Sequence, residues 1–189
     1  MCAMGRSTIF FSATLSPIDY YMDLLCGDGN SLRLSLPSPF PSDHRELLIC
    51  DAISTRYKDR DASIAKLVRA IYAAVSQKQG NYIVFAPSYA YMKQIADAFC
   101  EQYPKITTYI QTTGMNEEEK QAFLNRLETT TQLQVFFCVL GGMFSEGIDL
   151  KGERLIGTII IGVGLPQISY PLDLIKDHFQ EEKAMGYAY

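Results

Sequence analysis

Residues 141–152 read Gly-Gly-Met-Phe-Ser-Glu-Gly-Ile-Asp-Leu-Lys-Gly, and they follow the apolar run Val-Phe-Phe-Cys-Val-Leu at 135–140. The apolar run predicts a buried strand, and the glycines behind it predict a loop. Adjacent glycines let backbone N–H groups approach a phosphate or a sugar closely, because no Cβ stands in the way. The loop also holds two carboxylates, Glu146 and Asp149. Open α/β sheets bind ligands at the carboxyl ends of their strands, so the pattern favours a ligand-binding loop. A solvated turn with incidental acids is the alternative.

Length and charge restrict the class of protein. A chain of 189 residues suits one domain, with or without a short appendage, and its 48% hydrophobic content is enough for a full core. The net charge of −4 argues against a stand-alone nucleic-acid-binding module, which usually has a basic face. A domain that forms one wall of a shared channel remains compatible with this charge.

The cysteines and the apolar runs indicate the compartment. Five cysteines without a C-x-x-C spacing read as free thiols in a reducing environment. No run approaches the roughly 18 apolar residues of a membrane span, and no signal-peptide pattern opens the chain. His44 and His178 have no partner at metal-ligand spacing. We therefore expect a cytoplasmic protein with no membrane partner and no metal site of its own.

A proline-rich segment divides the chain. Residues 36–43 hold three prolines in eight positions, which excludes a helix or a central strand and favours a linker. Residues 1–35 then read as the end of a preceding domain, and residues 44–189 as the main domain. The elements that we predict are a β-prone run at 8–11, a helix at 18–25, a strand at 47–53, a helix at 62–76, a strand at 82–86, a helix at 89–103, a strand at 106–110, a helix capped by Asn116 that ends near 127, strands at 133–140 and 155–161, and a helix that begins near Pro171 and ends near 185.

The alternation of strands and helices in the main domain predicts a parallel sheet with helices on both faces. Polar or glycine-rich segments follow three of the strands, at 87–89, 141–149 and 164–166. Because parallel strands end at one edge, we expect these segments to crowd that edge of a doubly wound α/β fold.

Five short motifs, taken in order, resemble the second motor domain of superfamily 2 DNA helicases of the DinG/XPD type. The resemblance covers most of the chain and is strongest in motif V, which is similar nearly residue for residue. It implies a RecA-like fold. The motifs are Ser-Ala-Thr-Leu-Ser-Pro at 12–17 (motif III), Ser-Pro-Phe at 38–40, Phe-Ala-Pro-Ser-Tyr at 85–89 (motif IV), the loop at 141–149 (motif V) and Gly-Leu-Pro at 164–166. Ala86 and Gln167 stand where the family more often has an aromatic residue.

The resemblance implies roles at the nucleotide. Glu146 and Asp149 would sense ATP at the cleft between two motor domains, and Gly147 would permit a close approach. Ser12 and Thr14 of motif III would couple hydrolysis to strand contact. The alternative for each carboxylate is that it caps a nearby turn.

Contacts to DNA are implied for a second group of residues. The predicted DNA-binding residues are Ser88, Tyr89, Gly141, Gly142, Ser145 and Arg56. Arg56 belongs to a basic cluster with Lys58 and Arg60, interleaved with an aromatic residue. The alternatives are an N-cap for Ser88, core packing for Tyr89, a tight turn for the glycines and Ser145, and a solvated loop for Arg56.

The function that the resemblance implies is that of a fragment of an ATP-dependent DNA helicase. The full-length enzyme would use ATP and Mg²⁺, move 5′ to 3′ on single-stranded DNA, unwind duplexes and act in DNA repair or replication. Its partners would be single-stranded DNA and the first motor domain of the same polypeptide, and any iron–sulfur cluster would lie outside this chain.

The chain holds no G-x-x-x-x-G-K-[ST] loop and no Asp-Glu-Ala-His, and it stops at Tyr189 before motif VI. We therefore expect this fragment alone to be inactive in ATP hydrolysis. The alternatives are a non-catalytic RecA-like module that binds nucleotide or protein, and an α/β enzyme that acts on a phosphorylated small molecule.

Overall fold

The computed structural model describes residues 6–12, 15–25, 31–145, 148–164 and 169–183. The chain divides into two compact units, Met1–Ile49 and Cys50–Tyr189. In the described part of the first unit, the regular elements are α1 (Ile18–Leu25) and a 3₁₀ turn, η2 (Ser42–His44). The helix α1 confirms the prediction for residues 18–25.

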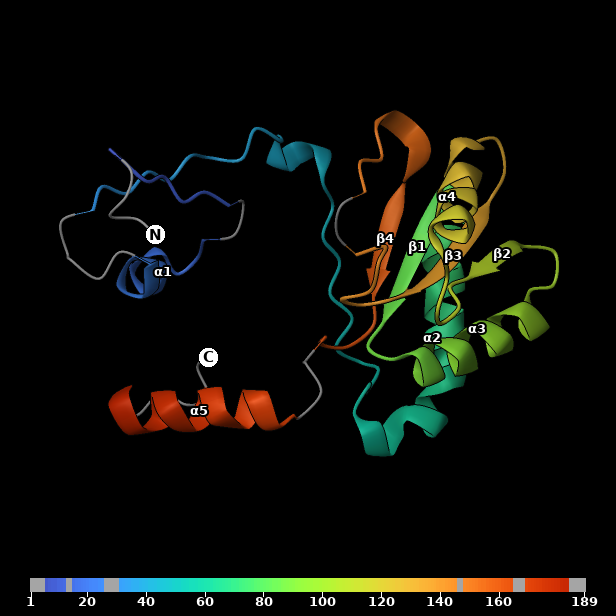
Figure 1. Ribbon diagram of the computed structural model, residues 1–189. Helices are drawn as coiled ribbons and strands as arrows, with labels where there is room; N and C mark the ends of the chain where they lie inside the picture. The colour runs from blue at the N-terminus through green and yellow to red at the C-terminus, as the bar shows by residue number, and fades with distance from the viewer. Residues whose placement is uncertain (1–5, 13–14, 26–30, 146–147, 165–168, 184–189) are drawn as a thin grey trace. The chain divides into compact units, whose positions relative to one another are not determined.

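The second unit is built on a parallel sheet (Figure 1). Its described strands are β1 (Asn81–Ala86), β2 (Thr107–Ile110), β3 (Gln134–Val139) and β4 (Gly157–Ile160), in the order β2-β3-β1-β4. All three strand pairings are parallel. The two central strands, β1 and β3, are buried at every residue, whereas the edge strands are only partly buried. This confirms the predicted parallel sheet with continuous apolar strands at its centre.

Helices cover both faces of this sheet, as predicted (Figure 1). On one face, α2 (Arg60–Val75) and α3 (Tyr89–Gln102) pack against the side chains of Tyr82, Val84 and Ala86 in β1. On the other face, α4 (Glu117–Asn125) and the 3₁₀ turn η4 (Arg126–Glu128) pack against the intervening side chains of the same strand. The period of two along each strand thus divides the apolar residues between two cores. The remaining described elements are the 3₁₀ turns η3 (Tyr57–Asp59) and η5 (Gly152–Arg154) and the helix α5 (Tyr170–Lys183).

The start of α4 follows from local chemistry. Asn116 Oδ1 accepts a hydrogen bond from the Glu119 backbone N–H at 2.9 Å, and Glu119 Oε2 accepts one from the Asn116 N–H at 2.9 Å. This reciprocal capping box satisfies two N–H groups that a helix start leaves unpaired. The N-cap predicted at Asn116 is therefore confirmed.

Two predicted strands are wrong. The described residues at 8–11 and at 47–53 form no strand. Leu47, Leu48 and Ile49 are each at least 74% exposed. An apolar run becomes a strand only where another strand offers hydrogen bonds, and no described strand pairs with either segment.

Two buried amides lie at the edge of the sheet where the strands begin. Asn81 Nδ2 donates to the carbonyl oxygens of Leu127 at 2.8 Å and Arg154 at 2.9 Å, and Gln134 Nε2 donates to Asn81 Oδ1 at 2.9 Å. These bonds fix η4 and the start of β4 to the two central strands. No described helix is long and apolar enough to cross a membrane.

Candidate functional site

The carboxyl ends of the central strands bring two of the motifs together. The segment after β1 leads to Ser88, and the segment after β3 leads to Gly141 and Gly142. The Leu140 N–H donates to the Ala86 carbonyl at 2.9 Å, so the parallel ladder continues to this edge. Motif IV and the first part of motif V therefore lie side by side, as the sequence predicts.

Gln111, directly after β2, connects these two motifs, and it was not among the residues predicted from the sequence. The residue is 1% exposed. Its Oε1 accepts the Val139 backbone N–H at 3.0 Å, and its Nε2 donates to the Tyr89 hydroxyl at 2.9 Å. Its own backbone N–H donates to the Phe137 carbonyl at 2.9 Å. A polar residue at the end of a strand was the available signal, but only the fold shows which groups it joins.

The segment after β3 forms a tight turn. Gly141 has φ of +69°, a conformation that favours glycine. A Cβ on Gly142 would lie 3.0 Å from the Val139 carbonyl oxygen and 3.3 Å from Gln111 Nε2. Ser145 Oγ donates to the Gly142 carbonyl at 2.6 Å, and the Ser145 N–H donates to the same oxygen at 3.0 Å. The turn itself thus requires both glycines and occupies the serine proton, which agrees with the tight-turn interpretation and leaves room for a ligand role.

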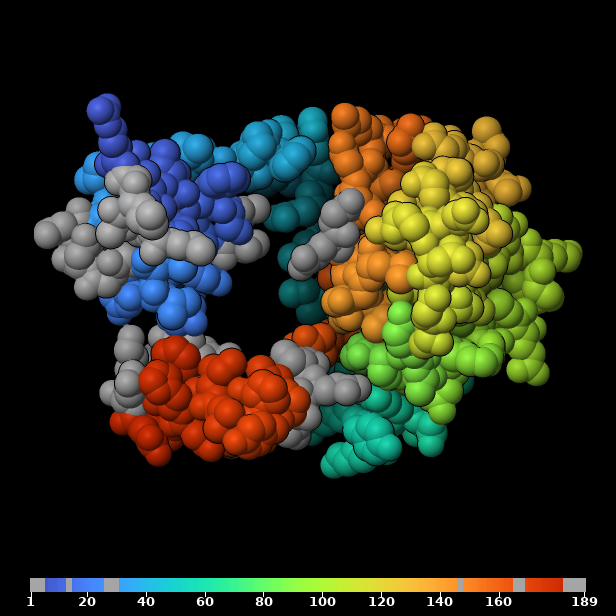
Figure 2. All heavy atoms as spheres, viewed as in Figure 1, coloured from blue at the N-terminus to red at the C-terminus, as the bar shows by residue number. Residues whose placement is uncertain are grey.

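Phe144 anchors this turn to the sheet. Its side chain is 1% exposed, and its ring stacks on that of Phe123 in α4 with centroids 4.4 Å apart. Figure 2 shows the segment after β3, in orange, against the yellow surface of α4. The anchor limits how far the turn can move, because aromatic burial of this kind stabilises by several kcal/mol (about 3–5 on truncation). Phe144 was not predicted as a core residue from its position in the glycine-rich loop.

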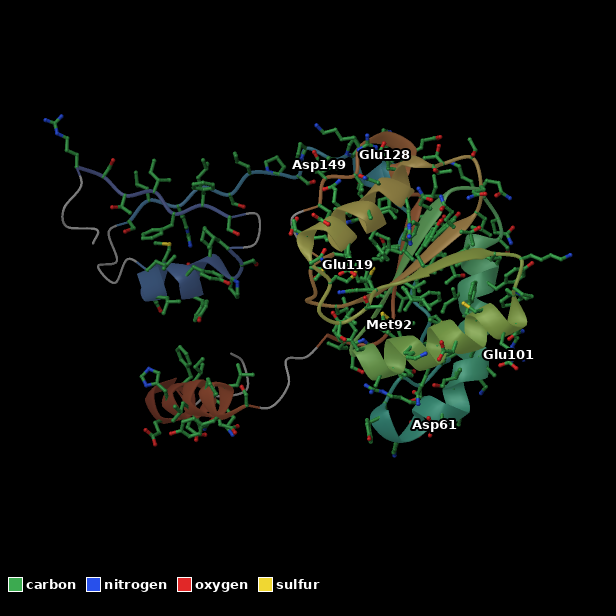
Figure 3. The ribbon with its side chains drawn as sticks, turned by 45° about the vertical axis from the view of Figure 1, so that its right-hand side comes forward. Asp61, Met92, Glu101, Glu119, Glu128 and Asp149 are labelled. Atoms are coloured by element: carbon green, nitrogen blue, oxygen red, sulfur yellow. The ribbon has the colours of Figure 1, made fainter. Side chains whose placement is uncertain are left out.

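Asp149 lies apart from the carboxyl edge. Its side chain is 77% exposed and forms an ion pair with Lys151 at 3.4 Å, while the flanking Ile148 and Leu150 pack against the second core. Figure 3 draws Asp149 toward the end of the sheet where Glu128 lies. Glu128 pairs with Arg154 just before β4, so this is the edge where strands begin. The expectation that Asp149 crowds the same edge as Ser88 is therefore wrong, because the chain after the turn runs back across the α4 face.

Ser88 and Tyr89 take the positions expected of capping and packing. Ser88 Oγ accepts the Tyr91 N–H at 3.4 Å and caps α3. Tyr89 is partly buried against the first core, with its hydroxyl bonded to Gln111. Ser88 remains half-exposed at the edge, so capping does not remove it from contact with a ligand.

The other predicted residues are placed as follows. Arg56 is exposed and precedes the turn η3. Gly164 lies against Leu140, since a Cβ there would stand 3.2 Å from Leu140 Cδ1. Ser12 is exposed in the first unit. Thr14, Glu146, Gly147 and residues 165–166 lie outside the described residues.

The acidic, histidine and cysteine side chains of the described residues do not gather into a cluster. Among them, no three His, Cys, Asp or Glu side chains gather closely enough to hold a metal ion. Burial raises the pKa of the Cys138 thiol to about 12, which keeps it a protonated core residue. The groups that the carboxyl edge presents include the Ser88 hydroxyl and the turn at Gly141 and Gly142, which suit a phosphate-bearing ligand.

Comparison with known families agrees with this arrangement. The family described as the helicase C-terminal domain matches residues 71–189, which include β1 to β4 and every motif of the carboxyl edge. The chain belongs to this family. The membership confirms the resemblance to the second motor domain of DinG/XPD-type helicases.

Curated relatives of this helicase domain carry related names. A protein of Methanocaldococcus jannaschii named a probable ATP-dependent helicase is 28% identical over 93% of this chain. The ATP-dependent DNA helicases CHL1 of Debaryomyces hansenii and chl1 of Schizosaccharomyces pombe are 24% and 25% identical over 68% and 95% of the chain. The matched regions are 27%, 17% and 23% of these three relatives, so the chain spans about a quarter of their length or less.

A solved structure of apo XPD shares the fold. It superposes with a TM-score of 0.54 at 16% identity, over 69% of this chain and 26% of the other. This likeness confirms the RecA-like α/β fold predicted from the sequence.

Proposed function

We propose that this chain is the second motor domain of an ATP-dependent DNA helicase that moves 5′ to 3′ on single-stranded DNA. In the intact enzyme, ATP binding and hydrolysis would close and open two motor domains and so separate the strands of a duplex. Support comes from the family membership and from relatives that are named ATP-dependent helicases. Action in DNA repair or replication is part of the same proposal.

One observation supports the part of this proposal that concerns DNA binding. Gln111 joins Val139, at the end of β3, to the Tyr89 hydroxyl, so the turn after β3 and the hydroxyl of Ser88 belong to one edge. The Gly142 N–H itself donates to the Val139 carbonyl at 3.1 Å, which shapes this turn. Polar groups of one edge, held at fixed positions, are suited to contact successive phosphates of a DNA strand. Their number is small and the chain is acidic, with a net charge of −4, so the affinity of this chain alone is expected to be weak and salt-dependent.

Asp149 supports the part of the proposal that concerns the nucleotide. Its exposed carboxylate, 77% accessible and paired only loosely with Lys151, is free to accept a hydrogen bond from a ribose or to order a loop of the first motor domain. The turnover of ATP belongs to the full-length protein.

The experiment is a fluorescence-anisotropy titration of labelled single-stranded DNA with the 189-residue chain at low salt. The Gly142→Val variant is titrated in parallel, because its side chain would enter the space held by Gln111 and the Val139 carbonyl. We expect weak binding that falls as salt rises, is lost in the variant and does not respond to ATP analogues. Absence of DNA binding together with a clear response to a nucleotide or protein would favour the non-catalytic module. A matched control is Ala74→Val, which introduces the same side chain at an exposed position in the last turn of α2, before the edge where the strands begin, and should leave DNA binding unchanged.

A further inference from the structure

Tyr57 projects from a loop whose shape is fixed. Its side chain is 86% exposed, although it stands on the short turn η3 directly before α2. Ser54 Oγ donates to Asp59 Oδ2 at 2.7 Å, and the Asp59 N–H donates to the Arg56 carbonyl at 2.9 Å. Ile53, before the loop, packs against the first core. The loop that carries the exposed ring is therefore stabilised by two internal hydrogen bonds, and it is fixed by Ile53 on one side and by α2 on the other.

A guanidinium group links this ring to the body of the domain. Arg60 Cζ lies 4.4 Å from the centroid of the Tyr91 ring and 5.3 Å from that of Tyr57. Tyr91 is 1% exposed, so the first of these contacts is a buried support. Both distances are within the range of cation–π attraction. Arg60 thus fixes a positive charge beside an aromatic face that is open to solvent.

The charge around Tyr57 favours an anion. Arg56 and Lys58 flank it in the sequence, and both are exposed. In the part of the chain that the structure describes, no ion pair involves these two cations or Arg60. Of the nearby acids, Asp59 accepts the Ser54 hydroxyl, and Asp61 is exposed in the first turn of α2. One cation, Arg60, therefore lies against the open ring, and two more, Arg56 and Lys58, flank it in the sequence.

The position of the loop ties it to the carboxyl edge. Thr55 Oγ1 lies 3.1 Å from where a Cβ of Gly162 would stand, just after β4. Tyr91, which supports Arg60, donates its backbone N–H to Ser88 Oγ at 3.4 Å. Arg60 and Tyr91 thus connect the exposed ring to Ser88, the predicted phosphate contact.

We propose that Tyr57 is a stacking platform for one unpaired base of a single-stranded nucleic acid, with Arg56, Lys58 and Arg60 contacting the phosphates on either side of that base. The inference rests on the proposed function and names a contact that the helicase motifs do not include. A base stacks on a phenol ring whatever its identity, which suits a protein that moves along a strand of any sequence. The cations neutralise backbone charge without reading sequence.

The chain contains no tryptophan, which allows a direct test. In the Tyr57→Trp variant, the new indole would be the single tryptophan, and a stacked base quenches its fluorescence. The control is Tyr72→Trp, in the last turn of α2, where the native ring stacks on Tyr103 at 4.0 Å. The variants are titrated at low salt with an oligothymidylate of about 12 nucleotides and with a blunt duplex of the same length.

We expect single-stranded DNA to quench the tryptophan at position 57 and to leave the one at position 72 unchanged. Tyr57→Ala should weaken binding about fivefold or more, and Tyr57→Phe, which keeps the ring, should bind within about twofold of the parent chain. The ring is exposed, so Tyr57→Ala is expected to fold normally, which far-ultraviolet circular dichroism checks.

The outcomes separate the two proposals. If the parent chain binds single-stranded DNA but Tyr57→Ala binds equally well and Tyr57→Trp is not quenched, the stacking platform is refuted and the helicase role stands. Equal quenching by the duplex also refutes an unpaired base as the ligand. If the parent chain binds no DNA at all, both proposals fail.

Discussion

Replacing Gln111 by leucine tests whether this residue holds the functional edge together. Leucine is similar in size but cannot accept the Val139 N–H or donate to the Tyr89 hydroxyl, the two side-chain bonds of 3.0 and 2.9 Å. Val139 is 8% exposed, so its N–H would lose its partner in a place that water does not reach easily. The Tyr89 hydroxyl is only partly buried, and water can replace its lost donor.

The expected loss of stability follows from these two bonds. A buried N–H without a partner costs about 1–3 kcal/mol, and a lost bond at a partly wet site costs about 0.5 kcal/mol. The added apolar burial of leucine offsets up to about 1 kcal/mol. The net decrease in the free energy of unfolding is therefore about 0.5–3.5 kcal/mol, or a Tm lower by about 1–14 °C for a chain of this size.

The assay is urea unfolding followed by circular dichroism, combined with the single-stranded DNA titration. Tyr89→Phe completes a double-mutant cycle, in which the coupling with Gln111→Leu should be about 0.5–1 kcal/mol. Gln134→Leu is the matched control, because Gln134 is also 1% exposed but lies where the strands begin. It should destabilise the fold while leaving the affinity of the folded chain for DNA unchanged. A change of less than about 0.5 kcal/mol in Gln111→Leu, or no coupling with Tyr89→Phe, would show that Gln111 does not join the two motifs.

Two further predictions concern the carboxylate and the buried thiol. In the full-length protein, Asp149→Ala should lower the rate of ATP hydrolysis about tenfold or more and change nucleotide-free DNA binding less than about twofold; unchanged turnover would refute the nucleotide role. Because burial raises the pKa of Cys138 to about 12, this thiol should resist alkylation in the native chain at pH 8–9, where the exposed Cys50 reacts, and become reactive in urea. The unfolded thiol loses its proton near its ordinary pKa of 9.0, so the Cys138 contribution to stability is complete below that pH and is lost as the pH rises toward 12. Labelling of native Cys138 as fast as Cys50 would contradict this.

The secondary structure of the main domain was predictable because its signals are local. The capping box of Asn116 and Glu119, the amphipathic pattern of α2 and the apolar run of β3 each act over a few residues, and the observed elements begin and end within about two residues of the predictions. The exceptions at 8–11 and 47–53 show the limit of such signals. These segments have the composition of strands, but a strand also requires a neighbour that sequence periodicity does not supply.

The candidate site was predictable in part. The motifs placed Ser88 and Gly142 at one edge, since parallel strands end together. Gln111 was missed because its partners lie 22 and 28 residues away, and nothing local distinguishes it from a solvated glutamine. Phe144 was missed because its partner Phe123 belongs to a different helix.

The sequence by itself determined the order of strands and helices from residue 60 onward, the parallel class of the sheet and the helicase family, because apolar periodicity, helix caps and motif residues are local features of the chain. The tertiary structure alone decided the strand order β2-β3-β1-β4, the path that takes Asp149 away from Ser88, and the support of Arg60 by Tyr91 beneath an exposed Tyr57. These features depend on hydrogen bonds and packing between distant segments. These hydrogen bonds and contacts form only when the chain folds and brings the segments together.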